Sequence, residues 1–381
     1  MFKMNKKIKG SKNLNVPNLR FPEFSGEWEQ ELLGTTCNVL MCKRILASQT
    51  NSEYGVPFYK IGTIGGIPDA YISQELFELY QAKYNYPRKG EVMITCAGTI
   101  GKTIMFDGND SYYQDSNIVW IDNPTNKFDN TFLYHFISKV DWSKLNTTTI
   151  VRIYNDDLRQ LKISYPTLTE QRKISIFLNL LDERIATQIK IIEKLESLIR
   201  GLYERLFNID GAAYIQLGNV AKIQKGQQIN GEELSEIGSY YVMNGGVVPS
   251  GYLEDFNTPA NTISISEGGN SCGYVQYNGV PFWSGGHCYT LIEPINSFNY
   301  KYLFHYLKFK EQSIMALRIG SGLPNIQKKD LERFPILNVS KEEQDKMACI
   351  FDDILDRIIC ERQIALKYEE QKKYLLSNLF I

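Results

Sequence analysis

The segment from Gly98 to Thr103 contains the residue types that come nearest to catalytic chemistry. It reads Gly-Thr-Ile-Gly-Lys-Thr and follows a predicted strand, as a phosphate-binding loop does. The first glycine of such a loop would fall at Cys96, so the residue that lets backbone amides wrap a phosphate is missing. We therefore expect no nucleotide site here. An enzyme that used this loop is a separate hypothesis, and it predicts nucleotide binding that Lys102→Ala abolishes.

The other reactive side chains form no constellation that indicates catalysis or metal binding. The three histidines are His135, His287 and His305, and the first and last lie on aromatic helix faces where we expect structural hydrogen bonds. The seven cysteines include no C-x-x-C pair, which argues against a zinc site or a disulfide framework and fits reduced thiols. There is no G-x-S-x-G or H-E-x-x-H motif. The sequence therefore predicts a recognition protein without a catalytic site or metal of its own.

The composition is that of an ordinary globular protein. The 381 residues include 42 Lys and Arg against 43 Asp and Glu, a formal charge of −1, and 43% are hydrophobic. This length indicates two or three domains. The lysine-rich N-terminal stretch lacks the apolar segment of a secretory signal, and no run reaches the ~18–20 apolar residues of a membrane span. We expect a soluble, cytoplasmic protein with no membrane partner.

The chain is duplicated with one fixed offset. Residues 153–207 match residues 326–380 at a spacing of 173, without a gap, with fifteen identities in 55 positions. Upstream the match weakens, although the segment around His135 still resembles the segment around His305. A period of this size indicates a duplicated domain, because solenoid repeats are ~20–50 residues long.

Each copy ends in a long predicted helix with a coiled-coil seam, because its apolar residues recur at alternating intervals of three and four. The seam of the first helix is Ile174, Leu178, Leu181, Ile185, Gln188, Ile192, Leu195, Ile199, Leu202 and Leu206. The seam of the second helix is Met347, Phe351, Ile354, Ile358, Glu361, Ala365, Tyr368, Leu375 and Leu379, and Lys372 interrupts it. Gln188 and Glu361 are repeat equivalents. We expect the two helices to pair as an intramolecular antiparallel coiled coil; the alternative is that each helix packs on its own neighbouring domain.

The fold class that this pattern predicts is α+β (mixed α/β) with an internal pseudo-twofold duplication. Short strands broken by Gly-rich turns fill both variable halves, and one helix is expected in each, at 130–139 and 299–310. The predicted segments are an N-terminal extension, a first variable domain, a first spacer helix, a second variable domain and a second spacer helix, at 1–27, 28–165, 166–211, 212–335 and 336–381.

This organisation closely resembles the specificity subunit of type I restriction–modification systems. The resemblance covers essentially the whole chain, and the repeat is its most specific part. It also includes the opening Leu19-Arg-Phe-Pro-Glu-Phe24 with Trp28, the Pro166…Glu170-Gln171 entry to the first helix, and the Ile326…Asp330-Leu331 approach to the second.

The resemblance implies a subunit that binds double-stranded DNA and catalyses nothing itself. Each variable half would be a target-recognition domain for one half of a bipartite, asymmetric DNA sequence. The helices would set the gap between the half-sites and dock two methyltransferase subunits, which motor-nuclease subunits join. S-adenosylmethionine, ATP and Mg are then expected on the partner subunits, with no cofactor on this chain.

Neither variable half has a net positive charge, so we expect DNA binding to depend on local clusters or on the partners. The candidate DNA-contacting residues are basic pairs and polar loop residues: Lys43, Arg44, Arg88, Lys89, Lys102, Gln114, Asn117, Lys222, Lys225, Asn244, Ser271, Arg318, Ser321 and Lys328. The alternative function is a coiled-coil scaffold whose variable halves bind protein. Sequence-selective DNA binding by the assembled complex would separate the two.

Overall fold

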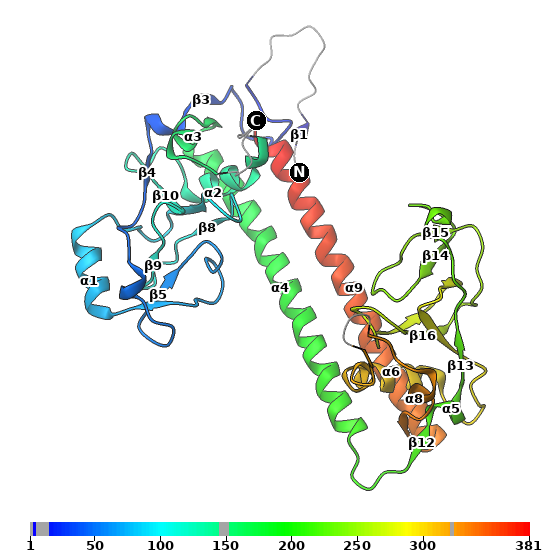
Figure 1. Ribbon diagram of the computed structural model, residues 1–381. Helices are drawn as coiled ribbons and strands as arrows, with labels where there is room; N and C mark the ends of the chain where they lie inside the picture. The colour runs from blue at the N-terminus through cyan, green and yellow to red at the C-terminus, as the bar shows by residue number, and fades with distance from the viewer. Residues whose placement is uncertain (1–2, 5–14, 145–151, 321–323) are drawn as a thin grey trace. The chain divides into compact units, whose positions relative to one another are not determined.

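A computed structural model describes residues 3–4, 15–144, 152–320 and 324–381 of this chain. The chain forms two compact units, and each unit includes one part of each of the two long helices (Figure 1). The first unit comprises residues 1–187 and 365–381, and the second comprises residues 188–364.

The first unit is built around a four-stranded antiparallel sheet. Its strands, in spatial order, are β4 (Asn38–Leu40), β10 (Ile118–Asp122), β7 (Val92–Thr95) and β8 (Thr103–Met105). All residues of β7 and β10 are buried, because these strands contribute side chains to two hydrophobic cores. One core includes α2 (Asn130–Lys139), which packs on β7 and β8, and the other includes a second, smaller sheet. Asp129 accepts a hydrogen bond from the Phe132 amide and so caps the start of α2.

The smaller elements of the first unit complete its two hydrophobic cores. In the second sheet the order is β6 (Tyr71–Ile72), β5 (Val56–Tyr59) and β9 (Tyr112–Tyr113), and β5 and β9 are parallel. The other elements are β1 (Lys3–Met4), β2 (Leu19–Arg20), β3 (Glu29–Leu32), η1 (Leu33–Thr35), η2 (Ala47–Gln49), α1 (Gln74–Lys83), η3 (Trp142–Lys144), α3 (Asn155–Arg159) and β11 (Lys162–Tyr165).

The second unit repeats the four-stranded and three-stranded sheets strand for strand. Its four-stranded sheet has the order β13 (Lys222–Lys225), β19 (Cys288–Ile292), β16 (Thr262–Ser266) and β17 (Val275–Asn278). Its three-stranded sheet has the order β15 (Tyr252–Leu253), β14 (Tyr240–Met243) and β18 (Trp283–Ser284), and β14 and β18 are again parallel. The remaining elements are β12 (Tyr214–Gln216), α5 (Leu217–Val220), η4 (Gly231–Glu233), α6 (Tyr300–Phe309), α7 (Glu311–Met315), α8 (Lys328–Glu332) and β20 (Pro335–Leu337). The predicted mixed fold and its duplication are therefore confirmed, and the duplication includes the variable halves.

The two long helices are α4 (Leu168–Phe207) and α9 (Lys341–Leu379), drawn green and red in Figure 1. Every residue of the predicted seams is buried or half-buried. Within the first unit Asp182 of α4 forms an ion pair with Lys372 of α9. Within the second unit Gln188 donates hydrogen bonds to the side chain and, at 3.3 Å, to the backbone carbonyl of Glu361. The helices therefore pair with each other inside each unit, in antiparallel directions.

The alternative packing that we considered, helix against neighbouring domain, is also present. At the end of α4 the buried residues are Ile199, Tyr203 and Phe207, which recur every four residues and face the core of the second unit. Leu202 and Leu206, which the seam pattern placed inward, are only half-buried. A single helix can contact both its partner helix and a domain because each contact uses a different face.

Two buried histidines link the variable halves to the long helices by hydrogen bonds. His135 of α2 makes a 3.2 Å hydrogen bond with Asn179 of α4. His305 of α6 contacts Asp352 of α9 at 2.9 Å and the Tyr203 hydroxyl at 2.9 Å. Both imidazoles are fully buried, and burial lowers the pKa of each, that of His135 to about 4. These contacts are structural, as the aromatic helix faces indicated.

Candidate nucleic-acid interface

Three loops of the first unit meet where β7 ends and β10 begins. We name them the first loop cluster, which comprises residues 60–66, 96–102 and 114–117. The Cys96 amide donates to the Asn117 carbonyl at 2.7 Å, which joins two of these loops. The Lys102 ammonium donates to the Ile64 carbonyl at 2.5 Å, which joins the third. These links bring together segments far apart in the sequence, at one end of the four-stranded sheet.

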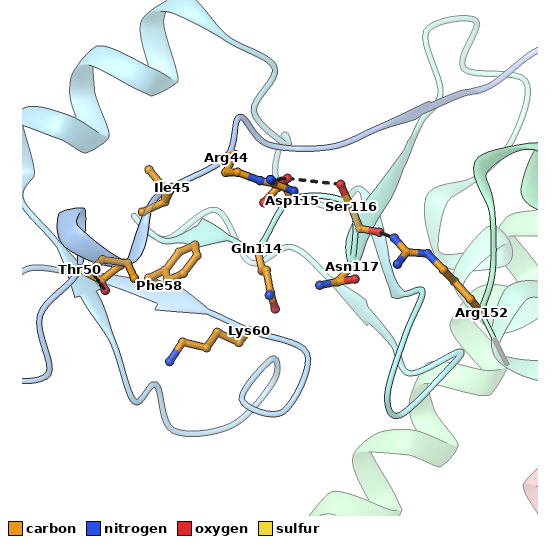
Figure 2. Close-up of a pocket in the computed structure, with 11 residues that line it drawn as sticks. Arg44, Ile45, Thr50, Phe58, Lys60, Gln114, Asp115, Ser116, Asn117 and Arg152 are labelled. Carbon is orange, nitrogen blue, oxygen red and sulfur yellow. Dashed lines mark hydrogen bonds and ion pairs between the residues drawn. The ribbon is translucent and has the colours of Figure 1, made fainter. Parts of the chain in front are cut away.

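A cavity of about 450 Å³ opens beside this cluster (Figure 2). It is lined by Arg44, Ile45, Ala47, Thr50, Phe58, Lys60, Gln114, Asp115, Ser116, Asn117 and Arg152. Arg44 pairs with Asp115 at 2.9 Å, and Arg152 donates to the Ser116 carbonyl at 2.7 Å. Ser116 has a φ of 61°, so the loop turns sharply between Gln114 and Asn117. Figure 2 shows the amide groups of these two residues on the same side of the loop, away from the Arg44–Asp115 pair.

The chemistry of this cavity suits polar recognition. Side-chain amides can donate and accept together, which is how Asn and Gln read the edge of adenine. Lys60 is held by Asp69 at 3.0 Å, with about two-fifths of its side chain exposed. Arg44 is 67% exposed, so its guanidinium can reach an external anion while it stays oriented by Asp115.

The second unit brings the equivalent segments together through the same backbone bonds. The Glu267 amide donates to the His287 carbonyl at 2.9 Å, as Cys96 does to Asn117. The Ile326 amide donates to the Glu267 carbonyl at 2.9 Å, as Ile153 does to Cys96. We name residues 244–250, 267–274 and 285–287 the second loop cluster. Glu267 and His287 thus occupy the places that Cys96 and Asn117 hold in the first unit.

Glu267 carries the charge at the centre of the second loop cluster. Its side chain is 10% exposed, and Oε1 accepts hydrogen bonds from Lys225 at 2.6 Å and from Tyr289 at 3.0 Å. The Nδ1 atom of His287 lies 3.8 Å from the other oxygen, Oε2. Lys225 and His287 are themselves 53% and 60% exposed. One buried carboxylate therefore lies beside two side chains, Lys225 and His287, that are more than half exposed.

Nine of the predicted DNA-contacting residues lie in or beside the two loop clusters. In the first unit these are Arg44, Lys102, Gln114 and Asn117. In the second unit they are Lys225, Asn244, Ser271, Arg318 and Lys328. Asn244 stabilises the second loop cluster, because its Oδ1 atom accepts a hydrogen bond from the His287 backbone amide at 3.0 Å. Arg318 lies close enough to Cys272 to oppose the rise in thiol pKa that burial causes.

The other predicted residues lie elsewhere. Arg88 and Lys89 precede β7, and Lys222 begins β13, so all three are at the opposite end of their sheets from the loop clusters. Lys43 turns toward the Tyr84 ring, 5.5 Å from its centroid. Ser321 falls outside the described residues.

Several residues of these sites were not among the sequence candidates, and they include Lys60, Arg152, Glu267 and His287. Glu267 left a signal in the sequence. Ile263 and Ile265 alternate with serines along β16, and the same period places Glu267 on the core-facing side. A carboxylate in that position must find a partner, because an unpaired buried charge is costly.

The segment from Gly98 to Thr103 does not have the structure of a phosphate loop. It connects β7 to β8, whereas a phosphate loop leads from a strand into a helix whose N-terminus faces the phosphate. Within the described ranges, we find no cluster of three or more potential metal-ligating side chains. The helices described also include none with the length and apolar content that a membrane crossing requires.

Comparison with known proteins identifies the family. The family model "Type I restriction modification DNA specificity domain" matches residues 25–197 and again residues 210–369. A Haemophilus influenzae protein described as a type I restriction enzyme specificity subunit is 48% identical over 46% of this chain, although the match spans only 42% of that protein. A similarly described Methanocaldococcus jannaschii protein is 21% identical over 97% of this chain and 96% of its own length.

A solved structure agrees on the fold. The crystal structure of a type I restriction–modification S subunit from M. genitalium superposes with a TM-score of 0.69 at 20% identity, covering 96% of this chain and 99% of that one. The family model covers most of the sequence in two successive matches, one to each variable half with its following helix. This chain therefore belongs to the family of type I restriction–modification DNA specificity domains and contains two copies of that domain.

Proposed function

We propose that this chain is the DNA-specificity subunit of a type I restriction–modification complex and catalyses no reaction itself. Each unit would read one half of a bipartite target. One observation carries this proposal: the two units share one topology, while the loop clusters at equivalent places present different side chains. A shared scaffold with different exposed chemistry suits two readers of different sequences.

The asymmetry of the target follows from the residues at equivalent positions. Amide and cationic side chains line the first site, in which Gln114 and Asn117 present amides beside Lys60. The second site presents Lys225 and His287 around a carboxylate. Because the donors and acceptors differ, the preferred bases should differ, and the target should lack twofold symmetry.

The two long helices would set the gap between the half-sites and dock methyltransferase subunits. Apolar residues on α4 that remain exposed support docking, among them Ile176 at 63% and Leu180 at 55%. In the first unit, Leu180 also lines a groove of about 510 Å³ with Leu181 and Leu375. We place S-adenosylmethionine, ATP and Mg on the methyltransferase and motor-nuclease partners, with no cofactor on this chain.

Charge supports a shared mode of DNA binding. The net charge of the chain is −1, whereas a protein that binds DNA alone usually carries a basic face. The loop clusters would supply base contacts and a few phosphate contacts, and the partner subunits would neutralise most of the phosphates. Binding to DNA should therefore require the assembled complex.

The test is co-expression with the neighbouring methyltransferase gene, followed by single-molecule sequencing of host DNA for methylated adenines. We expect one split motif, two short specified blocks around a fixed gap. A complex that assembles with an active methyltransferase but yields no motif would favour the scaffold function and contradict this proposal. Failure of a complex to form would contradict the docking role of the helices.

A second experiment tests the role of the helices in spacing. Glu193 is exposed on α4, and four residues inserted beside it add about one helical turn, or roughly 6 Å at 1.5 Å per residue. A compensating insertion at the equivalent place in α9, beside Leu366, keeps the helices paired. We expect a longer gap between unchanged half-sites. Changed half-sites with the original gap would contradict the spacing role.

A further inference from the structure

The second loop cluster contains a buried carboxylate with an unused acceptor atom. Glu267 is 7% exposed as a residue, and its Oε2 atom is buried with no hydrogen-bond partner among the described residues. The imidazole of His287 faces this oxygen, with its Nδ1 atom at 3.8 Å. A buried carboxylate oxygen that lacks a donor is costly, so a site that keeps one has a reason to do so.

The geometry around Glu267 aims two nitrogen groups outward. Lys225 comes from β13, and His287 comes from the loop before β19. The sheet order is β13, β19, β16, so the Glu267 side chain, just after β16, reaches past β19 to Lys225. Tyr289 donates to the same Oε1 atom as Lys225 and also contacts the Ile326 carbonyl at 3.2 Å. The carboxylate is thus fixed from the core side, whereas its two nitrogen partners are more than half exposed.

The first unit has none of this chemistry. Cys96 occupies the place of Glu267, and Asn117 occupies the place of His287, joined by the same backbone hydrogen bond. Burial raises the pKa of the Cys96 thiol to about 12, so the thiol is neutral. The fold therefore requires the backbone hydrogen bond at this position, but it does not require the Glu267 side chain. The Glu267 carboxylate and its partners therefore indicate a role that is specific to the second unit.

We propose that Lys225 and His287 are the DNA-contacting pair of the second unit, with Glu267 as the positioning residue that orients them. This inference rests on the proposed function and assigns residues to its second half-site. In the complex with DNA, His287 would donate Nδ1–H to the free Oε2 atom of Glu267 and present Nε2 to the DNA. Lys225 would contact the same strand while Glu267 neutralises part of its charge.

The test uses the methyltransferase complex and the target that sequencing identifies. Three duplexes are compared by fluorescence anisotropy at one salt concentration: the intact target, one with the first half-site scrambled, and one with the second half-site scrambled. The variants are Glu267→Gln, which keeps the shape of the side chain, and His287→Asn, which copies the first unit. Lys222→Met is the matched control, because Lys222 is exposed at the far end of the same sheet and pairs with the exposed Glu293.

For Glu267→Gln and His287→Asn we expect about tenfold weaker binding to the intact target, the loss of one good base or charge contact. Scrambling the second half-site should then cost less than in wild type, while scrambling the first should cost the same. A residue that only supported the fold would lower the affinity for all three duplexes by the same factor.

The outcomes separate this inference from the proposed function. If wild type discriminates between the duplexes but both variants behave like it, the assignment is wrong and the proposed function stands. Equal losses at both half-sites, or an equal loss in Lys222→Met, would also overturn the assignment. If the wild-type complex binds all three duplexes alike, the proposed function fails. His287→Asn changes an exposed side chain, so it keeps the test valid should Glu267→Gln fail to fold.

Discussion

Replacing Phe380 with alanine should destabilise the first unit by about 3–5 kcal/mol, although Phe380 lies just beyond the last turn of α9. The residue is 3% exposed and belongs to the core beneath the four-stranded sheet. Its ring centroid lies 4.9 Å from that of Phe132 and 6.3 Å from that of Phe136, both on α2. The Lys139 ammonium lies 5.7 Å from the same ring, and burial lowers the pKa of this lysine.

The expected magnitude follows from the cavity that the substitution leaves. Deleting a buried phenyl ring removes its transfer free energy and leaves Phe132 facing a void that rigid strands on its other side cannot fill. With an m-value of about 3 kcal/mol per M, the urea midpoint should fall by about 1–2 M. The equivalent Phe207→Ala should have at least as large an effect on the second unit, because Phe207 is fully buried among five aromatic rings.

Tryptophan fluorescence during urea unfolding measures the stability of the first unit, to which Phe380 belongs. Three of the four tryptophans, Trp28, Trp120 and Trp142, are buried in the first unit, and Trp28 lies 6.2 Å from Phe132. Ile381→Ala is the control, because Ile381 is 44% exposed and should change stability by less than about 0.5 kcal/mol. A Phe380→Ala midpoint equal to that of this control would refute the packing that we describe.

Three further perturbations test buried polar contacts by urea unfolding. Arg20→Ala should cost about 3–5 kcal/mol, because Arg20 makes two 2.7 Å contacts to Glu170 and both side chains are at least 95% buried; a cost below 1 kcal/mol would contradict it. The free energy of unfolding should fall by up to about 3 kcal/mol as pH drops from 6.5 to 4, because His135 gains a proton over this range in the unfolded chain but not in the folded chain. The variant His135→Gln should show a smaller dependence of unfolding free energy on pH. Glu361→Leu alone should destabilise, because the buried Gln188 amide loses its side-chain acceptor, whereas adding Gln188→Leu should restore most of the loss; equal costs for the single and double variants would contradict the side-chain contact.

Much of the fold could be predicted from periodicity and repetition, since both are local. The 3.5-residue period identified the long helices and their inward faces, and the fixed offset placed Gln188 and Glu361 at equivalent points. Their contact then follows from antiparallel pairing of two copies. The shared topology of the variable halves could not be predicted, because it depends on which strands pair across long loops, and these pairings leave no regular spacing in the sequence.

The candidate site could be predicted only in part, for a related reason. A basic pair such as Arg88-Lys89 and a lysine such as Lys102 look alike in sequence, yet they lie at opposite ends of the same sheet. Which end carries the loop cluster depends on long-range pairing. Glu267 was missed because a glutamate before two glycines reads as a solvated turn residue, although its inward place in β16 marks it as buried.

The way the loops are held together explains how two halves of one fold can present different surfaces. One bond that joins the loops recurs in both units and is between backbone groups: Cys96 to Asn117 in the first unit, and Glu267 to His287 in the second. Backbone bonds do not depend on side-chain identity, so substitutions at these positions change the exposed chemistry at little cost to the fold. Glu267 is an instructive exception, because a buried charge must bring its own partners, Lys225 and Tyr289. Where such a set of partners has been assembled at a loop cluster, it indicates a function for the site beyond the stability of the domain.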